Sequence, residues 1–307
     1  MVSQEATARL IDQFRARRPI RTGSFIVTVF GDAISPRGGT VWLGSLITAL
    51  ENFDINQRLV RTSVFRLAKE GWLTARQKGR RSYYSLTIEG RERFALATSR
   101  IYGEPHADWS GAWCLIILPQ LEPGERELIR KDLGWLGFGA FSGNLLALPV
   151  TDLARLRAQL AELGHLDKIV VMSATTPGSL YGEPVRKLVH DSWGLADLES
   201  RYLAFIREFE PVLADLKRGG AIDPRIAFQV RTLLIHEYRK ILLRDPWLPA
   251  ELLPDHWHGT VAYHLCRDLY RAVYREAEEY LGDDMETADG PLPPSAAHFY
   301  QRFGGLD

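Results

Sequence analysis

The chain has 307 residues, of which 46% are hydrophobic and 25% are charged. This length predicts two or three domains, and the composition is that of a globular protein, which excludes wholesale disorder and a fibrous repeat. No apolar run reaches the roughly 18 residues of a membrane span, and residues 1–19 carry acids and arginines where a secretion signal is apolar, so we predict a cytoplasmic protein with no membrane partner. Cys114 and Cys266 lack the C-x-x-C spacing of a zinc or redox site, and we expect both to be small buried side chains.

The charges are unevenly distributed along the chain, although its formal net charge is zero. Residues 1–103 hold 17 Lys and Arg against 8 Asp and Glu, a net charge of +9, and the remainder holds 21 against 30, a net charge of −9. Such an asymmetry favours a nucleic-acid partner for the basic third. A basic surface that is merely solvated is the alternative.

The basic third begins with a short charged helix over residues 4–17, which ends before Pro19. Residues 24–33 are apolar enough to be buried, and SPRGG at residues 35–39 is typical of a tight turn. An amphipathic helix follows, because apolar residues recur at i, i+3, i+4, i+7 and i+10. These residues are Leu43, Leu46, Ile47, Leu50 and Phe53.

A second helix is predicted over residues 56–70, with Gly71 as its stop and a capping box formed by Asp54 and Gln57 at its start. One of its faces is apolar and the opposite face is basic and polar, as in a helix that presents side chains to base edges in a major groove. Residues 72–87 then form two strand-like runs around a basic tip. The residues predicted to contact DNA are Asn56, Gln57, Arg58, Arg61, Thr62, Arg66, Arg76, Lys78, Arg80 and Arg81.

Helix, turn, helix and basic hairpin, in this order, predict a winged helix-turn-helix that binds double-stranded DNA. A winged helix that is used for protein contacts is the alternative. Long segments of the chain closely resemble the PaaX-type repressors of phenylacetic acid catabolism. They are GDAISPRGGTVWLGSL (31–46), NQRLVRTSVFRLAKEGWL (56–73), GRRSYYSLT (79–87), HEYRKILLRDPWLPAELLPDHWHG (236–259) and FYQRFGGL (299–306). The resemblance implies a homodimer on operator DNA, with phenylacetyl-CoA or a related aryl-CoA thioester as the effector that releases it.

The middle of the chain reads as strand, helix, two strands, helix and strand, over residues 113–119, 125–136, 137–141, 144–150, 153–164 and 167–174. This order is typical of a ferredoxin-like domain. The family resemblance implies that the domain is similar to the Cas2 nuclease fold. Cas2 carries a metal-binding aspartate near the end of its first strand, whereas this strand ends in Leu118, Pro119 and Gln120. We therefore expect no nuclease activity.

Beyond Gly182 the sequence predicts four helices that pack as a bundle, over residues 183–193, 196–216, 224–244 and 260–281. The tail at 283–307 is rich in Pro, Gly and Asp, and we expect order only where Phe299, Tyr300 and Phe303 dock. The predicted fold class is α+β. It comprises a winged helix-turn-helix domain (1–103), a ferredoxin-like, Cas2-like domain (104–182) and a helical C-terminal domain with a tail (183–307).

The acidic part of the chain shows no complete catalytic or metal-binding motif. His236 and Glu237 begin like a zincin H-E-x-x-H, but Lys240 stands in place of the second histidine. His264 and Cys266 are two residues apart on a predicted helix, which points them about 200° apart and prevents them from sharing an ion. We therefore predict no metal, no cofactor and no enzymatic activity.

A CoA thioester needs cations for its phosphates and an aromatic slot for its acyl group. The residues predicted to contact it are His236, Arg239, Lys240, Trp257, His258 and Tyr263. The alternative is that these side chains only build the core of the helical region. The leading function is thus a ligand-responsive repressor. The two alternatives are an acyl-CoA-processing enzyme with a regulatory DNA-binding head and a module whose basic head binds an acidic protein.

Overall fold

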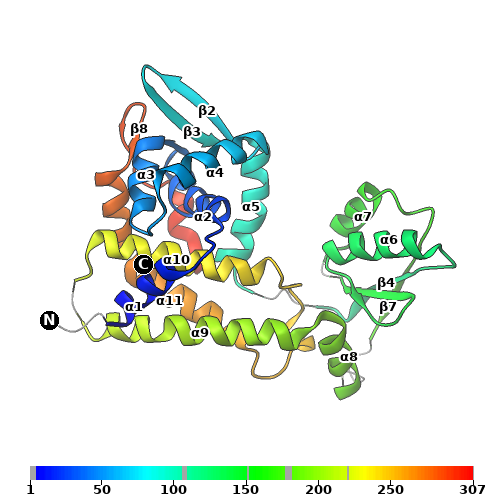
Figure 1. Cartoon of the computed structure of the whole chain (residues 1–307). Helices are drawn as coiled ribbons and strands as arrows, with labels where there is room; N and C mark the ends of the chain where they lie inside the picture. The colour runs from blue at the N-terminus through cyan, green and yellow to red at the C-terminus, as the bar shows by residue number, and fades with distance from the viewer. Residues whose placement is uncertain (1–4, 106–108, 151, 177–181, 220, 307) are drawn as a thin grey trace. The chain divides into compact units, whose positions relative to one another are not determined.

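The structure is a computed structural model that describes residues 5–105, 109–150, 152–176, 182–219 and 221–306 (Figure 1). It combines helices with small antiparallel sheets and therefore belongs to the α+β class. The chain forms two compact units. Unit 1 comprises residues 1–104, 203–243 and 260–307, and unit 2 comprises residues 105–202 and 244–259. This division differs from the predicted boundaries at residues 103 and 182, because the chain leaves unit 1 and later returns to it.

Unit 1 begins with α1 (Glu5–Ala16) and α2 (Thr22–Val29). From α2 the chain continues through a π-helical turn, η1 (Phe30–Ile34), and a 3-10 turn, η2 (Ser35–Arg37). The predicted burial of residues 24–33 is confirmed for all but Ser24. The helical path stops at Gly38 and Gly39, whose φ angles of 82° and 71° favour glycine.

The next segment of unit 1 contains two helices and a three-stranded antiparallel sheet in the order β1-β3-β2. The elements are β1 (Thr40–Trp42), α3 (Leu43–Glu51), α4 (Gln57–Lys69), β2 (Leu73–Lys78) and β3 (Arg81–Leu86). The two strands β2 and β3 form a hairpin that is closed by the pair Lys78 and Arg81 around Gly79 (φ 63°). Both predicted helices and the predicted hairpin are therefore present.

The predicted capping box at the start of α4 is wrong. The side chain of Asn56 caps this helix by accepting a hydrogen bond from the backbone N–H of Leu59 at 3.0 Å. Asp54 lies earlier, in a turn where its φ is 62°, and this turn directs Ile55 into the core. The helix consequently begins after Asn56, and Gln57 is its first residue.

The remaining elements of unit 1 come from α5 and from the second half of the chain. Their bounds are α5 (Ile88–Tyr102), α9 (Leu195–Lys217), α10 (Pro224–Leu242), α11 (His258–Asp284), β8 (Glu286–Thr287), β9 (Gly290–Pro291) and η5 (Ala297–Gly304). The division between the units falls inside α9 and α11. Helix α10 packs on α1, α2 and α5. Its side chains are buried almost all around, which is typical of a central helix.

The predicted bundle of four C-terminal helices is wrong, since α8 (Glu183–Trp193) belongs to unit 2 and α10 packs on helices of the N-terminal third. Docking of the tail through Phe299 and Phe303 is confirmed by their burial. Tyr300 is 42% exposed, so its predicted docking is wrong. Phe299 and Phe303 point inward from one side of η5, and the neighbouring Tyr300 points away.

A buried polar network around Asp32 connects the N-terminal helices of unit 1 to its C-terminal elements. The Oδ2 atom of Asp32 accepts from Arg231 Nε at 2.8 Å, and Oδ1 accepts from Arg302 Nη1 at 3.0 Å. The hydroxyl groups of Tyr102 and Tyr270 donate to Oδ1 at 2.6 and 2.9 Å. Asp32 thus makes close contacts with α5, α10, α11 and the tail at once.

Glu278 on α11 extends this network. It accepts from Arg231 Nη1 at 2.7 Å and from Arg37 Nη2 at 2.8 Å. The hydroxyl of Ser295 also donates to Glu278, and Arg37 Nη1 donates to the carbonyl of Pro293 at 3.1 Å. Arg37 is therefore buried in the fold, although its segment reads as a simple turn in the sequence.

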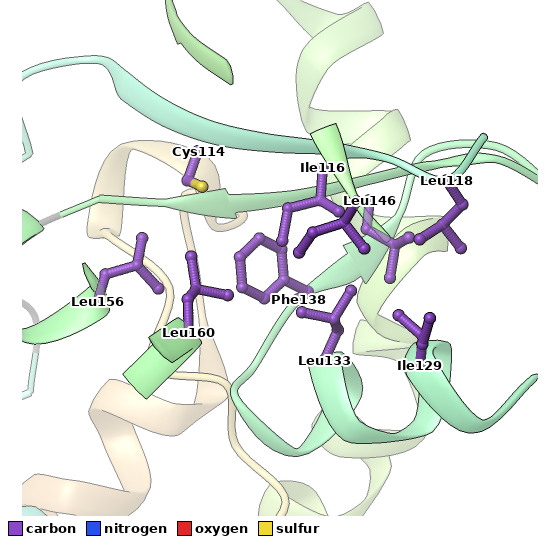
Figure 2. Packing of buried hydrophobic residues seen from close by; sticks show 10 residues of the cluster. Cys114, Ile116, Leu118, Ile129, Leu133, Phe138, Leu146, Leu156 and Leu160 are labelled. Carbon is purple, nitrogen blue, oxygen red and sulfur yellow. The ribbon is translucent and has the colours of Figure 1, made fainter. Parts of the chain in front are cut away.

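Unit 2 contains a four-stranded antiparallel sheet in the order β5-β6-β4-β7. Its elements are β4 (Ala112–Ile117), α6 (Pro123–Trp135), β5 (Gly139–Ala140), β6 (Leu145–Pro149), α7 (Leu153–Glu162) and β7 (Val170–Thr175). Helices α6 and α7 pack on one face of the sheet, with Leu133 and Leu160 facing Ile116 and Phe138 in a shared apolar core (Figure 2). Unit 2 also includes α8 and the 3-10 turn η4 (Ala250–Leu252).

Cys114 and Cys266 are buried and unpaired, as predicted. Burial raises the pKa of the Cys114 thiol to about 11 and also raises the pKa of Cys266, so both stay protonated near neutral pH. Within the part of the chain that the structure describes, none of the helices combines the length and the apolar character that crossing a bilayer requires.

Candidate nucleic-acid interface

Helix α4 presents one continuous polar face to solvent. Its opposite face packs on α2 and α3 through Val60, Val64 and Leu67. Most of the exposed residues follow helical spacing, which places them on one side of the helix. The exposed residues on this side are Gln57, Arg58, Arg61, Thr62, Phe65, Arg66 and Lys69, and Leu59 is exposed elsewhere on the helix. The structure therefore brings together the five α4 residues that were predicted to contact DNA, and it adds Phe65, which is 72% exposed.

The arginines of this face differ in how much the protein engages them. Arg58 and Arg61 form no ion pair with any residue that the structure describes. With the Gln57 amide oxygen turned toward Arg61, it accepts from Nε at 3.0 Å and Nη2 at 2.8 Å. Arg66 lies against Gly23, where an added Cβ would be 2.6 Å from Nη2, and its Nε is 3.6 Å from Glu70. Arg58, Arg61 and Lys69 are consequently the cations of α4 that form no ion pair among the described residues.

The β2–β3 hairpin carries four exposed cations, of which two are already paired. Lys78 Nζ donates to the backbone carbonyl of Ala288 at 2.8 Å and lies 3.3 Å from Asp289 Oδ1. Arg81 Nη1 donates to Glu286 Oε2 at 2.5 Å, and its guanidinium stacks 4.1 Å from the centre of the Trp42 ring. The other two cations, Arg76 and Arg80, form no ion pair among the described residues.

The partners of Lys78 and Arg81 belong to residues 286–291, which we call the acidic hairpin. It consists of β8, β9 and the turn between them, and β8 packs beside β1. Sequence reasoning missed this element because it assigned residues 283–307 to a weakly ordered tail. Asp289 followed by Gly290 is a turn signal that indicates a hairpin, but nothing local in the sequence indicates that its acids meet a basic hairpin more than 200 residues away.

The chain is similar to known proteins in sequence and in structure. The family model described as "PaaX-like protein" matches residues 21–90, and the one described as "PaaX-like protein C-terminal domain" matches residues 193–283. The transcriptional repressor PaaX of Escherichia coli (strain K12) is 39% identical over 290 residues, which cover 94% of this chain and 92% of that protein. The chain belongs to the PaaX family. Among solved structures, the uncharacterized protein Rv0674 from Mycobacterium tuberculosis has a TM-score of 0.49 and 21% identity, over 76% of this chain and 88% of that one.

The first PaaX family match contains the whole candidate interface. Residues 21–90 run from the start of α2 through β3, and they include every residue that was predicted to contact DNA. The second match covers α9, α10 and most of α11, which supply Arg231 and Glu278 to the buried network. The acidic hairpin lies just beyond this second segment.

The six residues that were predicted to contact an effector in this PaaX family member are divided between the two units. His236, Arg239, Lys240 and Tyr263 belong to unit 1, whereas Trp257 and His258 belong to unit 2. Most of them have protein partners. In unit 2, His258 Nδ1 is 2.7 Å from Glu199 Oε1, and the centre of the Trp257 ring is 5.7 Å from that of Tyr202. In unit 1, Lys240 Nζ is 2.7 Å from Glu237 Oε2, and the centre of the Tyr263 ring is 5.8 Å from that of Phe303.

Arg239 is a buried guanidinium that has no carboxylate partner among the described residues. Its Nη2 donates to the carbonyl and the hydroxyl of Ser24 at 3.2 and 3.1 Å, and its Nε has no hydrogen-bond partner in the described part of the chain. Burial lowers the pKa of Arg239. A buried guanidinium that lacks a counter-charge is costly, and an anion beside it would reduce that cost.

His236 is expected to make the stability of the protein depend on pH. Burial, together with the cations Lys240, Arg239 and Arg17, lowers its pKa from 6.5 to about 3, and Thr28 Oγ1 lies 3.0 Å from its Nδ1. The folded state therefore holds neutral His236, whereas the unfolded state binds a proton as the pH falls below 6.5. This stabilisation is present above pH 6.5 and is lost as the pH falls from 6.5 toward 3.

The measurement is chemical denaturation of the wild type and of His236→Gln, which keeps a polar side chain beside Thr28. Between pH 7 and pH 5.5 the free energy of unfolding should fall by about 1.2 kcal/mol more in the wild type than in the variant. Other titrating groups contribute equally to both proteins and cancel in the difference. Equal pH dependence of the two proteins would contradict the lowered pKa.

The remaining candidates are the possible metal ligands and the two thiols. Within the described residues, no group of three or more His, Cys, Asp or Glu side chains is arranged to hold a metal ion. The two thiols are buried and protonated, so neither is an activated nucleophile.

Proposed function

We propose that the protein is a homodimeric transcriptional repressor that binds double-stranded operator DNA and is released by phenylacetyl-CoA or a related aryl-CoA thioester. The observation that carries this proposal is the presence of two exposed arginines on α4, Arg58 and Arg61, which form no ion pair among the described residues, in a chain that is 39% identical to a protein named transcriptional repressor PaaX. The effector comes from the family resemblance, which names phenylacetyl-CoA.

The arrangement of unit 1 supports a winged helix-turn-helix. Two helices, α3 and α4, are joined by a short turn and followed by an antiparallel hairpin, and the third strand, β1, pairs with β3. In such domains the second helix enters the major groove and the hairpin lies along the phosphates or in the minor groove. The strand order of unit 2 similarly supports the ferredoxin-like, Cas2-like domain, with α6 and α7 on one face of the sheet.

In this proposal the residues of α4 and of the hairpin have different tasks. Gln57, Arg58, Arg61 and Thr62 lie in the first two turns of α4, from which side chains reach base edges. Arg76 and Arg80 on the hairpin bind phosphates, which fixes the position of the protein without reading the sequence. Asn56 caps α4, so it orients the helix rather than contacting a base through its side-chain oxygen. The proposed contacts of Arg66, Lys78 and Arg81 each require the release of a contact within the protein.

Arg61→Ala is expected to weaken binding to the operator by about 1 to 3 kcal/mol, because a bidentate pair with a base is lost. Binding to random duplex DNA should change much less. Fluorescence anisotropy with a labelled fragment of the protein's own promoter and with a random duplex of equal length measures both effects. Arg80→Ala is the matched control, and it should weaken binding to both duplexes similarly. An equal loss on both duplexes for Arg61→Ala would remove its role in base recognition.

A homodimer would place two α4 helices in successive major grooves, roughly 34 to 36 Å apart along the DNA. The thioester releases the protein only if it binds the DNA-free arrangement more tightly, since a ligand with equal affinity for both arrangements shifts nothing. Support for an effector contact is strongest at Arg239, because its buried guanidinium has no carboxylate partner in the part of the chain that the structure describes.

The experiment that tests the proposed function is a titration of the protein on its promoter fragment with phenylacetyl-CoA and, separately, with phenylacetate. Retention of the fragment at low salt, followed by release with the thioester alone, is the expected result. Release by the free acid but not by the thioester would contradict the effector, and failure to retain the promoter fragment would contradict the whole proposal.

A further inference from the structure

The cations of the β2–β3 hairpin are not all free to meet DNA. Lys78 and Arg81 form the pair that closes the hairpin, next to its turn. Both are already bound to the acidic hairpin, Lys78 to Asp289 and to the carbonyl of Ala288, and Arg81 to Glu286. Only Arg76 and Arg80 are left without an ion pair among the described cations of the β2–β3 hairpin.

The backbone of the acidic hairpin is fixed to the body of unit 1 by contacts that do not involve its carboxylates. The backbone N–H of Glu286 donates to Ser45 Oγ on α3 at 3.1 Å. Met285 and Leu292, on either side of the hairpin, are buried, and Leu292 N–H donates to the Met285 carbonyl at 2.8 Å. Arg37 holds the following carbonyl of Pro293. The anchoring of the acidic hairpin is therefore independent of its ion pairs with Lys78 and Arg81.

A DNA phosphate and a carboxylate compete for the same positive charges. The two ion pairs are about half exposed on the cation side, so each contributes little by itself and a phosphate can displace it. After displacement, two carboxylates would remain within a Debye length of the DNA backbone and would repel it. The arrangement therefore weakens phosphate binding without preventing it.

We propose that the acidic hairpin is an intramolecular competitor of DNA, which binds Lys78 and Arg81 and so reduces the affinity of the protein for the phosphate backbone. This inference rests on the proposed function. Because phosphate contacts carry no sequence information, the competitor lowers binding to random DNA along with binding to the operator. Sequence recognition then depends more heavily on α4.

The test is the double variant Glu286→Gln/Asp289→Asn, which removes both charges and keeps the size of the side chains. We expect it to bind promoter and random duplexes about 3 to 10 times more tightly than the wild type at 0.1 M salt. The plot of log K against log salt concentration should become steeper by about 1 to 2, since each new phosphate contact adds about 0.9 to the slope. Anisotropy titrations at salt concentrations from about 50 to 300 mM measure the affinity and the slope. Over this range the Debye length falls from about 14 Å to about 6 Å.

The matched control is Glu279→Gln/Asp283→Asn, which makes the same change in net charge at two exposed acids of α11. It should leave the slope unchanged. A second variant, Lys78→Gln, should weaken DNA binding more in the Glu286→Gln/Asp289→Asn background than in the wild type, where Lys78 is occupied. Three results would each refute the proposed competitor. They are equal effects of the two double variants, an unchanged slope in Glu286→Gln/Asp289→Asn, and equal effects of Lys78→Gln in both backgrounds.

The failure of this inference differs from the failure of the proposed function. If the wild type retains its promoter and the double variant binds as the wild type does, only the competitor is refuted. If the wild type does not retain its promoter at low salt, the repressor proposal is refuted first. Should the double variant unfold, Asp289→Asn alone provides the same slope measurement with one charge, because the Asp289 side chain is 91% exposed.

Discussion

Asp32→Asn is expected to lower the free energy of unfolding by about 3 to 5 kcal/mol, the range found when one partner of a buried ion pair is removed. Asp32 is 1% exposed and faces two buried guanidinium groups, those of Arg231 and Arg302. An asparagine of the same shape keeps one acceptor but removes the negative charge. Glu278 would then be the remaining carboxylate of this network, and it is shared between Arg231 and Arg37.

Urea denaturation followed by circular dichroism measures this loss. Asp12→Asn is the matched control, because the Asp12 side chain is 72% exposed and forms its ion pair with Arg15 of the same helix. The control should change the free energy of unfolding by less than about 0.5 kcal/mol. A loss below 1 kcal/mol for Asp32→Asn would mean that the network is not a determinant of stability.

Phe25→Ala is expected to cost about 3 to 5 kcal/mol, because it opens a cavity at the centre of an aromatic cluster. The Phe25 ring is fully buried, and its centroid lies 5.0 Å from Phe14, 4.8 Å from Phe53 and 4.9 Å from His236. These neighbours come from α1, from the turn after α3, and from α10. The cavity would therefore loosen the contact between α10 and the helices that support the candidate interface.

Phe65→Ala is the matched control for this prediction, since the same atoms are removed from a ring that is 72% exposed on α4. It should change the free energy of unfolding by less than about 0.5 kcal/mol. Thermal and chemical denaturation of both variants would check the difference. Similar losses for the two phenylalanines would contradict the central position of Phe25.

The elements of the candidate interface could be predicted because their signals are local. Apolar spacing defined α3 and α4, and Gly79 between two short strand-like runs defined the hairpin. The same spacing showed which face of α4 is exposed. The helix cap was mispredicted because Asp54 and Asn56 are both good capping residues, and only the buried Ile55 between them decides which one is used.

The partners of these elements could not be predicted, because they depend on contacts between distant segments. An isolated Asp32 in an apolar segment indicates a buried acid, but it does not reveal that Arg231 and Arg302 will neutralise it. The acids of the acidic hairpin carry no periodicity that points to Lys78 and Arg81. Closeness in sequence between residues 236 and 263 suggested one effector site, yet these residues are divided between the two units.

The return of the chain to unit 1 has a consequence for folding during synthesis. Residues 5–104 are synthesised before α10, α11 and Arg302, so Asp32 must wait for Arg231 and Arg302, and Phe25 must wait for His236. Until then Asp32 lacks both guanidinium partners. In a PaaX family protein of this design, the proposed contacts with DNA therefore depend on an interface whose supporting helices are synthesised last.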